Sequence, residues 1–227
     1  DQDKLMKQVL KDMRIDEKEL KPRAVLGYVG RFKSEALNPK EAMVQATTER
    51  MHRVISAYAK YEGALREANA LDFDDLLTNW LILLSEVPEA KKIYSEQFRY
   101  ILVDEYQDTN KLQFKIIKLL SNCHKNILAV GDDAQSIYSF RAAEIRNILD
   151  FSKEFPGTKI FKLETNYRST PEILSLANES IKHNKNQYHK KLRSLLDSGE
   201  PPSLVLLPNP GEEANFIVQK VSDLKDE

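Results

Sequence analysis

The fold of this 227-residue chain is decided by the stretch YILVDEYQDT, residues 100–109. An apolar strand ends here in two adjacent carboxylates, Asp104 and Glu105, and the polar residues after them cannot continue the strand. In a parallel sheet, ligands bind beyond the carboxyl ends of the strands. Two carboxylates at that edge suit Mg²⁺ and an attacking water, the two needs of nucleoside triphosphate hydrolysis. Many buried strands also end in a surface carboxylate, so this stretch alone leaves both interpretations open.

Three further segments decide between them. Residues 127–141 read ILAVGDDAQSIYSFR, a second apolar strand that runs into a polar turn. Residues 163–170 read LETNYRST, and residues 71–77 read LDFDDLL. In this order and spacing they match the patterns VDExQDTN, VGDxxQSIYxxR and LExNYRS, with LDFDDLL as an upstream hallmark. From about residue 20 to its end, the chain resembles a UvrD/PcrA/Rep-type superfamily 1 DNA helicase.

The composition is that of a soluble globular protein with one large or two small domains, because 41% of the residues are hydrophobic and 30% are charged. We expect neither a membrane span, which needs about 20 apolar residues, nor a signal peptide. The single cysteine, Cys123, excludes an internal disulfide and predicts a cytoplasmic location. The net charge of −1 gives no global argument for nucleic-acid binding, although a basic channel can coexist with an acidic exterior.

The first 70 residues have the spacing of helices throughout. A first helix is predicted by four apolar residues, Leu5, Met6, Val9 and Leu10, and a second one over 22–37, broken near Gly27–Gly30. The capping sequence NPKE at 38–41 predicts a helix of about 30 residues that runs to about Asn69. Asp72 is expected to cap a further helix over 73–85.

Short apolar strands and amphipathic helices alternate from residue 99 onward. We predict strands at 99–103, 126–130 and 159–163, with helices at 111–121 and 142–153 between them. This order is typical of an α/β fold with a parallel sheet covered on both faces. A helix from Thr170-Pro171, a strand at 203–207 and a helix at 212–224 follow, as the start of a second sheet.

The resemblance implies a RecA-like parallel sheet of the P-loop NTPase type, interrupted by a helical inserted subdomain. Residues 1–70 would then form the helical insertion, residues 71–160 the later half of the first RecA-like domain, and residues 161–227 the beginning of the second. The cofactors that the resemblance implies are ATP and Mg²⁺.

The resemblance also implies roles for individual side chains. Asp104 would hold Mg²⁺ mainly through water, and Glu105 would orient and deprotonate the attacking water. Gln135 would sense the γ-phosphate, because an amide can both donate and accept hydrogen bonds. For Gln107 and Asp108 two interpretations stay open: a polar network around the γ-phosphate, or caps for the helix that starts near Asn110.

Tyr167 and Arg168 occupy positions where the family stacks a tyrosine on adenine and points an arginine at the γ-phosphate. A guanidinium is always charged and forks onto phosphate oxygens, which suits it to stabilising transition-state charge. The alternative is a surface pair in front of a helix.

Single-stranded DNA is the expected polymer partner. Phe140 falls where the best-known members carry a tryptophan that stacks on a base, although it could instead be a core residue. Arg141 would touch DNA or couple this loop to the nucleotide, or form a structural salt bridge. Ala142 replaces the glycine that is usual in this motif. The basic stretch 183–193 could follow a DNA backbone or be a solvated loop, and the four histidines lack zinc-ligand spacing with the lone cysteine.

The phosphate-binding pattern G-x-x-x-x-G-K-[ST] does not occur in this sequence, and the first residue is Asp1. We therefore expect an internal segment of an ATP-dependent 3′–5′ DNA helicase or translocase roughly three times as long. It would act on single strands and duplex junctions, with repair or recombination proteins as partners. The segment alone should neither hydrolyse ATP efficiently nor unwind DNA.

Two alternatives remain: a truncated, non-catalytic module that binds DNA or a partner, and a subunit of a nuclease-linked recombination helicase. A non-catalytic module would have no need for the four residues that the chain keeps, Asp104, Glu105, Gln135 and Arg168.

Overall fold

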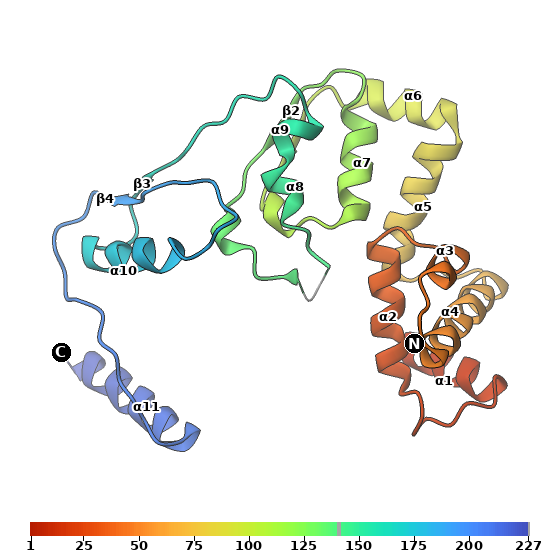
Figure 1. Cartoon of the computed structure of the whole chain (residues 1–227), viewed down its shortest axis with the longest axis horizontal. Coiled ribbons are helices and arrows are strands. Elements are labelled where there is room, and N and C mark those ends of the chain that lie inside the picture. Colours follow the sequence, from red (N-terminus) through yellow and green to blue (C-terminus); the bar gives the residue numbers. More distant parts are fainter. Residues whose placement is uncertain (140–141, 227) are drawn as a thin grey trace. The chain divides into compact units, whose positions relative to one another are not determined.

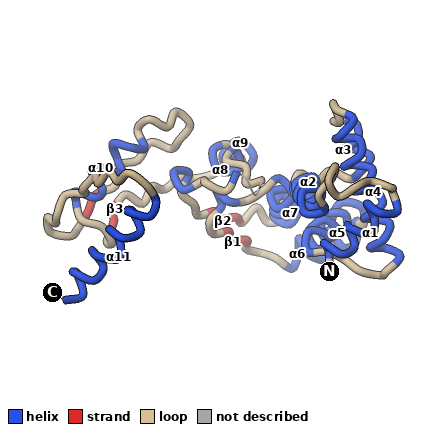
Figure 2. Tube along the Cα trace, turned by 90° about the horizontal axis from the view of Figure 1, so that it is seen from below, coloured by secondary structure: helices blue, strands red, loops and turns tan. Residues whose placement is uncertain are grey.

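In the computed structural model, which describes residues 1–139 and 142–226, the chain divides into two units. The first unit is Asp1–Lys159 and the second is Ile160–Glu227. Helices predominate in both units and the strands are short (Figures 1 and 2). The small sheets are parallel, so the chain is α-rich within an α/β fold. None of the described helices is long and apolar enough to cross a membrane.

Helices α1 (Gln2–Asp12), α2 (Pro22–Ser34) and α4 (Glu49–Glu67) pack against one another at the N-terminus. The helix predicted from the spacing of Leu5, Met6, Val9 and Leu10 is confirmed as α1. Each helix contributes one apolar stripe to a shared core, and burying a large apolar side chain stabilises the fold by about 1.5–3 kcal/mol. The core consists of Met6, Val9, Leu10, Leu20, Val25, Val29, Val54, Ala57, Tyr58, Tyr61 and Leu65.

The predicted break in the second helix is wrong, because α2 continues through Gly27 and Gly30. Gly30 has a packing role instead. A Cβ atom at this position would lie only 3.3 Å from the Oδ2 atom of Asp74. The missing side chain therefore lets the N-terminal end of the helix that begins at Phe73 approach α2 closely.

The predicted helix of about 30 residues is also wrong, since it is two helices, α3 (Pro39–Val44) and α4. Its start is confirmed: the Asn38 side chain accepts the amide of Glu41 at 3.0 Å, and the Glu41 side chain accepts the amide of Asn38 at 2.9 Å. The chain leaves the helix at Gln45, and Thr48 starts α4 by accepting the amide of Met51 at 3.2 Å. A threonine hydroxyl favours caps over helix interiors, which explains the break.

Helix α5 (Phe73–Glu86) begins at Asp72 with a capping box, as predicted. The next helix, α6 (Pro88–Gln97), was not predicted, although Pro88 is a typical first helical residue. Helices α5 and α6 pack on α7 (Lys111–Ser121), which has the predicted bounds. The core between them contains Leu84, Leu112 and Ile116, with Trp80 packed edge-on against Tyr94 at 4.6 Å.

Strands β1 (Ile101–Val103) and β2 (Ile127–Ala129) pair in parallel, so this part of the predicted sheet is confirmed. Helix α7 contacts β1. On the other face of the sheet Leu102 and Leu128 lie side by side and are 71% and 54% exposed. The expectation that both faces are covered is therefore wrong for the residues that the structure describes.

The segment after β2 contains two one-turn helices, α8 (Arg146–Leu149) and α9 (Phe151–Glu154), in place of the continuous helix predicted at 142–153. They meet at Asp150, which ends one and starts the other. Ala142 has a φ of 62°, a left-handed conformation that costs a residue with a side chain about 1–2 kcal/mol. A helix cannot begin at such a residue, and the first turn of α8 forms four residues later.

In the second unit, β3 (Thr165–Asn166) pairs in parallel with β4 (Arg193–Ser194), beside α10 (Pro171–Ile181). The predicted start of α10 is confirmed, and α11 (Pro210–Asp226) contains the predicted last helix. The strands predicted at 159–163 and 203–207 are wrong, since neither segment is a strand. A strand needs a neighbour to satisfy its amides and carbonyls, and among the residues that the structure describes neither segment has a strand paired with it.

Candidate functional site

Asp104 and Glu105 directly follow strand β1. Glu105 has a φ of 48° and a ψ of 43°, which is uncommon for a residue with a side chain. The Oδ1 atom of Asp104 accepts the amide of Glu105 at 2.9 Å, so the first carboxylate stabilises the conformation of the second. Both side chains remain exposed at the carboxyl end of the strand, where a ligand can reach them.

The turn after Glu105 is bonded to the end of the neighbouring strand. The amide of Tyr106 donates to the carbonyl of Val130 at 2.9 Å, and the amide of Asp108 donates back to the carbonyl of Glu105 at 2.9 Å. The Tyr106 ring is fully buried and meets Phe151 edge-on at 5.2 Å. Burial, with a smaller contribution from the charge of Glu154, raises the pKa of Tyr106 to about 12, so this phenol stays neutral at physiological pH.

Gln107 is buried, and its amide group makes two hydrogen bonds in opposite directions. Its Nε2 atom donates to Oε2 of Glu105 at 2.7 Å, and its Oε1 atom accepts the backbone amide of Asp132 at 3.0 Å. Gly131 makes room for this side chain, because a Cβ atom there would lie 2.6 Å from Oε1 of Gln107. The turn after β1 and the turn after β2 are therefore connected through one side chain.

Gln135 lies in the second of these turns, in the 3₁₀ helix Asp133–Gln135. Asp132 organises the turn: its Oδ1 atom accepts the amide of Ala134 at 3.0 Å, and its Oδ2 atom accepts Nε2 of Gln135 at 2.9 Å. Gln135 is exposed. Two predicted site residues, Glu105 and Gln135, are thus connected by hydrogen bonds in which Gln107 and Asp132 are the intermediate links.

The interpretation of Gln107 and Asp108 as helix caps is wrong. Asn110 caps α7 by accepting the amide of Gln113 at 2.9 Å, and Gln113 accepts the amide of Asn110 at 3.0 Å. The side-chain amide of Asn147, from α8, also donates to the carbonyl of Thr109 at 3.0 Å. These contacts hold the segment between the carboxylates and α7 without help from Gln107.

Tyr167 and Arg168 belong to the second unit and follow strand β3. The Oδ1 atom of Asn166 accepts the amides of Arg168 and Ser169 at 2.9 and 2.8 Å, which forms a tight turn in front of α10. The side chain of Tyr167 is 75% exposed, and that of Arg168 is also exposed. Their roles toward a nucleotide stay predictions. Phe140 and Arg141, the predicted DNA contacts, lie outside the described residues.

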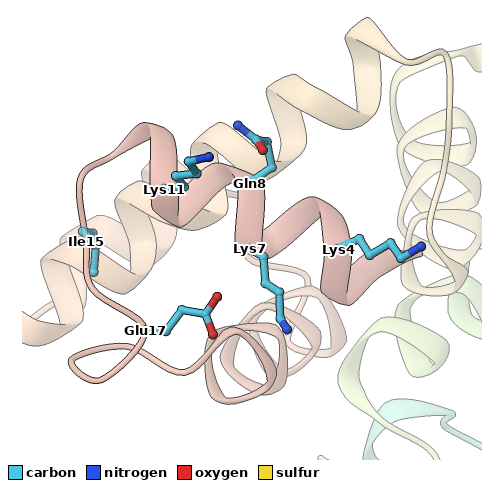
Figure 3. Close-up of a pocket in the computed structure, with 6 residues that line it drawn as sticks. All are labelled: Lys4, Lys7, Gln8, Lys11, Ile15 and Glu17. Atoms are coloured by element: carbon cyan, nitrogen blue, oxygen red, sulfur yellow. The ribbon is translucent and has the colours of Figure 1, made fainter.

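Two hollows lie away from the predicted catalytic residues. One, of about 390 Å³, lies between α10 and residues 187–194 and includes four basic residues of the stretch 183–193, which are His189, Lys190, Lys191 and Arg193. The other, of about 330 Å³, lies on α1 (Figure 3) and is lined by Lys4, Lys7, Gln8, Lys11, Ile15 and Glu17. Both have basic side chains at their rims.

A buried ion cluster surrounds Lys33 and was not predicted from the sequence. Its side chain is 1% exposed, and its Nζ atom lies 2.7 Å from Asp72, 2.6 Å from Asp75 and 2.8 Å from Glu62. Burial alone would lower the pKa of Lys33, but hydrogen bonds to these three carboxylates outweigh it and raise the pKa above its usual value. The cluster holds the start of α5, where the LDFDDLL segment lies, against α2 and α4.

A signal for this cluster was present in the sequence. Val25, Val29 and Lys33 follow one another at intervals of four residues, so the lysine continues an apolar stripe of α2. A lysine on such a stripe is buried only when paired, and the acidic segment at 72–75 offers partners.

Comparison with known proteins identifies the family of the chain. The UvrD/REP helicase N-terminal domain matches residues 1–156, and the UvrD-like helicase C-terminal domain matches residues 161–227. The protein named ATP-dependent DNA helicase PcrA of Staphylococcus epidermidis (strain RP62A) is 41% identical over 221 residues, which cover 97% of this chain and 30% of that protein. The PcrA protein of Staphylococcus aureus (strain Mu50) gives the same identity and coverage. The chain thus spans 30% of the length of these relatives, and it belongs to the UvrD-like helicase family.

Proposed function

We propose that this chain is a segment of an ATP-dependent DNA helicase or translocase that moves 3′ to 5′ along single-stranded DNA. Duplex junctions in repair, replication or recombination are its substrates. The observation that carries the proposal is the hydrogen-bonded connection from Glu105 through Gln107 and Asp132 to Gln135, at the carboxyl ends of two parallel strands. Ligands of α/β sheets bind at such edges. The names of the relatives, ATP-dependent DNA helicases, support ATP hydrolysis as the reaction and DNA as the polymer that is bound.

Glu105 is the proposed general base, which orients the attacking water and takes its proton. Its carboxylate is exposed to solvent, and its backbone is fixed by hydrogen bonds on both sides. Asp104 is the proposed metal-binding residue: its exposed carboxylate fits Mg²⁺, which keeps most of its water and needs one or two protein oxygens. When bound there, Mg²⁺ would supply positive charge that offsets the negative charge developing on the phosphate during hydrolysis.

Gln135 is the proposed γ-phosphate contact. One N–H of its side-chain amide donates to Asp132, which fixes the direction of the amide. The second N–H can donate to a phosphate oxygen, and the carbonyl oxygen can accept a hydrogen bond from the attacking water. Tyr167 is proposed to stack on adenine and Arg168 to bind the γ-phosphate. Phe140 and Arg141 are proposed DNA contacts.

The proposed domain organisation follows the family. Residues 1–70 form the helical insertion, residues 71–160 the later half of a first RecA-like domain, and residues 161–227 the beginning of a second. Because the 227 residues contain no G-x-x-x-x-G-K-[ST] pattern, we propose that the chain on its own neither hydrolyses ATP efficiently nor unwinds DNA.

The decisive experiment measures DNA-stimulated phosphate release by the full-length gene product that contains these residues. Glu105→Gln should lower kcat by at least about 100-fold while single-stranded DNA binding is kept, since it removes the base and little volume. Glu89→Gln, at an exposed position in the first turn of α6, is the matched control and should keep full activity. A Glu105→Gln protein that turns over ATP like the control would refute the assignment.

A further inference from the structure

We infer that Gln107 is a positioning residue that sets the orientation of the Glu105 carboxylate and transmits the state of the Gln135 turn to it. The inference deepens the proposed function and rests on it for its catalytic part. The geometric part stands on the structure alone: one buried side chain, 1% exposed, bonds the carboxylate after β1 and the backbone after β2.

The chemistry of the position requires a glutamine. Its partner on one side is a carboxylate, which only accepts hydrogen bonds, and its partner on the other side is a backbone N–H, which only donates. A neutral amide satisfies both at once. A glutamate at 107 would place a second carboxylate against Glu105, and an asparagine would be one methylene too short to reach both partners.

The Gln107 side chain is closely surrounded at Gly131. Gly131 is the residue over which the amide passes, and a Cβ atom there would also lie 3.0 Å from Cδ1 of Ile148 and 3.2 Å from the amide nitrogen of Tyr106. The backbone of Gly131, the side chain of Gln107 and Ile148 of helix α8 thus lie close together. A displacement of the Asp132 turn therefore changes the hydrogen bond to Oε1 of Gln107, and through Gln107 the hydrogen bond to Oε2 of Glu105.

The hydrogen bonds couple Gln135, the proposed γ-phosphate contact, to Glu105, the proposed general base. Gln135 is bonded to the side chain of Asp132, and the backbone of Asp132 is bonded to Gln107. A ligand that binds the exposed side-chain amide of Gln135 therefore contacts the same turn whose backbone is hydrogen-bonded to Gln107. Glu105 is fixed by its neighbours through the backbone, but its carboxylate has Gln107 as a side-chain partner.

The structural test uses amide hydrogen exchange of the 227-residue chain, followed by NMR. Gln107→Met removes both hydrogen bonds at similar volume and should speed exchange of the Asp132 amide at least about tenfold. Gln107→Glu keeps an acceptor for that amide and should stay within about threefold of the parent. Gln113→Met, which removes a cap contact of α7 at the same edge, is the matched control and should leave Asp132 unchanged. Unchanged exchange in Gln107→Met would overturn the contact.

The functional test places the same substitutions in the full-length gene product. Gln107→Met and Gln107→Glu should each lower kcat for DNA-stimulated ATP hydrolysis at least about tenfold, with KM for ATP within about threefold, because both remove the donor to Glu105. Gln113→Met should keep kcat within about twofold. A Gln107→Glu protein with the parent kcat would overturn the positioning role. A parent protein without ATP turnover would refute the proposed function itself, while the exchange of Asp132 would still decide whether the contact exists.

Discussion

The N-terminal helices and the second unit place their apolar side chains in different environments. Helices α1, α2 and α4 bury a continuous core, and even a lysine is enclosed there with three carboxylates. In the described part of the second unit, Leu174 is the one buried apolar side chain. Large residues such as Phe161, Leu163 and Leu204 are each more than three-quarters exposed.

The difference follows from the kinds of secondary structure involved. A helix satisfies its backbone hydrogen bonds within itself and needs only one apolar partner face. A strand needs neighbouring strands for its backbone and cover for both faces. Segments 159–163 and 203–207 have the sequence of strands, but no strand in the described part of the chain pairs with either, and their apolar side chains stay exposed.

The largest expected effect breaks the ion cluster of the N-terminal region. Lys33→Met should destabilise the first unit by about 3–5 kcal/mol, because it leaves the carboxylates of Asp72 and Asp75 buried without their cation. Urea unfolding followed by the fluorescence of Trp80, the single tryptophan of the chain, measures it. Glu19→Gln, which removes an exposed ion pair with Arg53, is the control and should cost less than about 1 kcal/mol. Equal losses in the two variants would contradict the account.

A pair of leucine truncations compares the two regions directly. Leu10→Ala empties a fully buried position in α1 and should cost about 2–5 kcal/mol. Leu176→Ala changes a residue of α10 that is 58% exposed and should cost about 0.5 kcal/mol or less. Urea unfolding followed by circular dichroism measures both. A large loss for Leu176→Ala would show that the second unit buries this face.

The smallest effect concerns a carboxylate that the N-terminal region holds unfavourably. Burial, and next the charge of Asp72, raise the pKa of Asp74 above its usual value of 3.8, although Lys33 opposes this. The folded state therefore binds a proton more tightly than the unfolded state, and this group's contribution to stability is lost as the pH rises through its folded pKa.

Asp74→Asn should accordingly be more stable than the parent at pH 7, and the gain should shrink as the pH falls toward 4. Thermal unfolding at several pH values, with Asp12→Asn on the exposed side of α1 as the control, measures this dependence. A gain that is constant over this range would mean that burial of the charge is not its cause.

Local signals made much of the fold predictable. The capping residues Asn38, Asp72 and Asn110 mark helix starts within a few residues of sequence, and the bounds of α7 follow from such signals. The site residues Asp104, Glu105 and Gln135 were placed at strand ends in the same way.

The remaining features depend on contacts between distant residues. Lys33 meets Asp75 across 42 positions and Gln107 meets the Asp132 amide across 25, and no local pattern fixes either pair. The strands expected at 159–163 and 203–207 failed for a related reason, because a strand exists only if its partner does. Ala142, in a left-handed conformation, likewise shortened a helix whose apolar spacing looked continuous.

One measurement tests most directly the claim that hydrogen bonds within the first unit hold the strand ends at Asp104 and Glu105, while two strand-like segments of the chain stay unpaired. It is the native-state hydrogen-exchange profile of the 227-residue chain. The account predicts strong protection of the amides of Tyr106 and Val130, which bond across the ends of β1 and β2 at 2.9 and 2.8 Å, and exchange near the unfolded rate at residues 160–163 and 204–207. Protection of those two segments equal to that of Tyr106, or rapid exchange at Tyr106 and Val130, would contradict it.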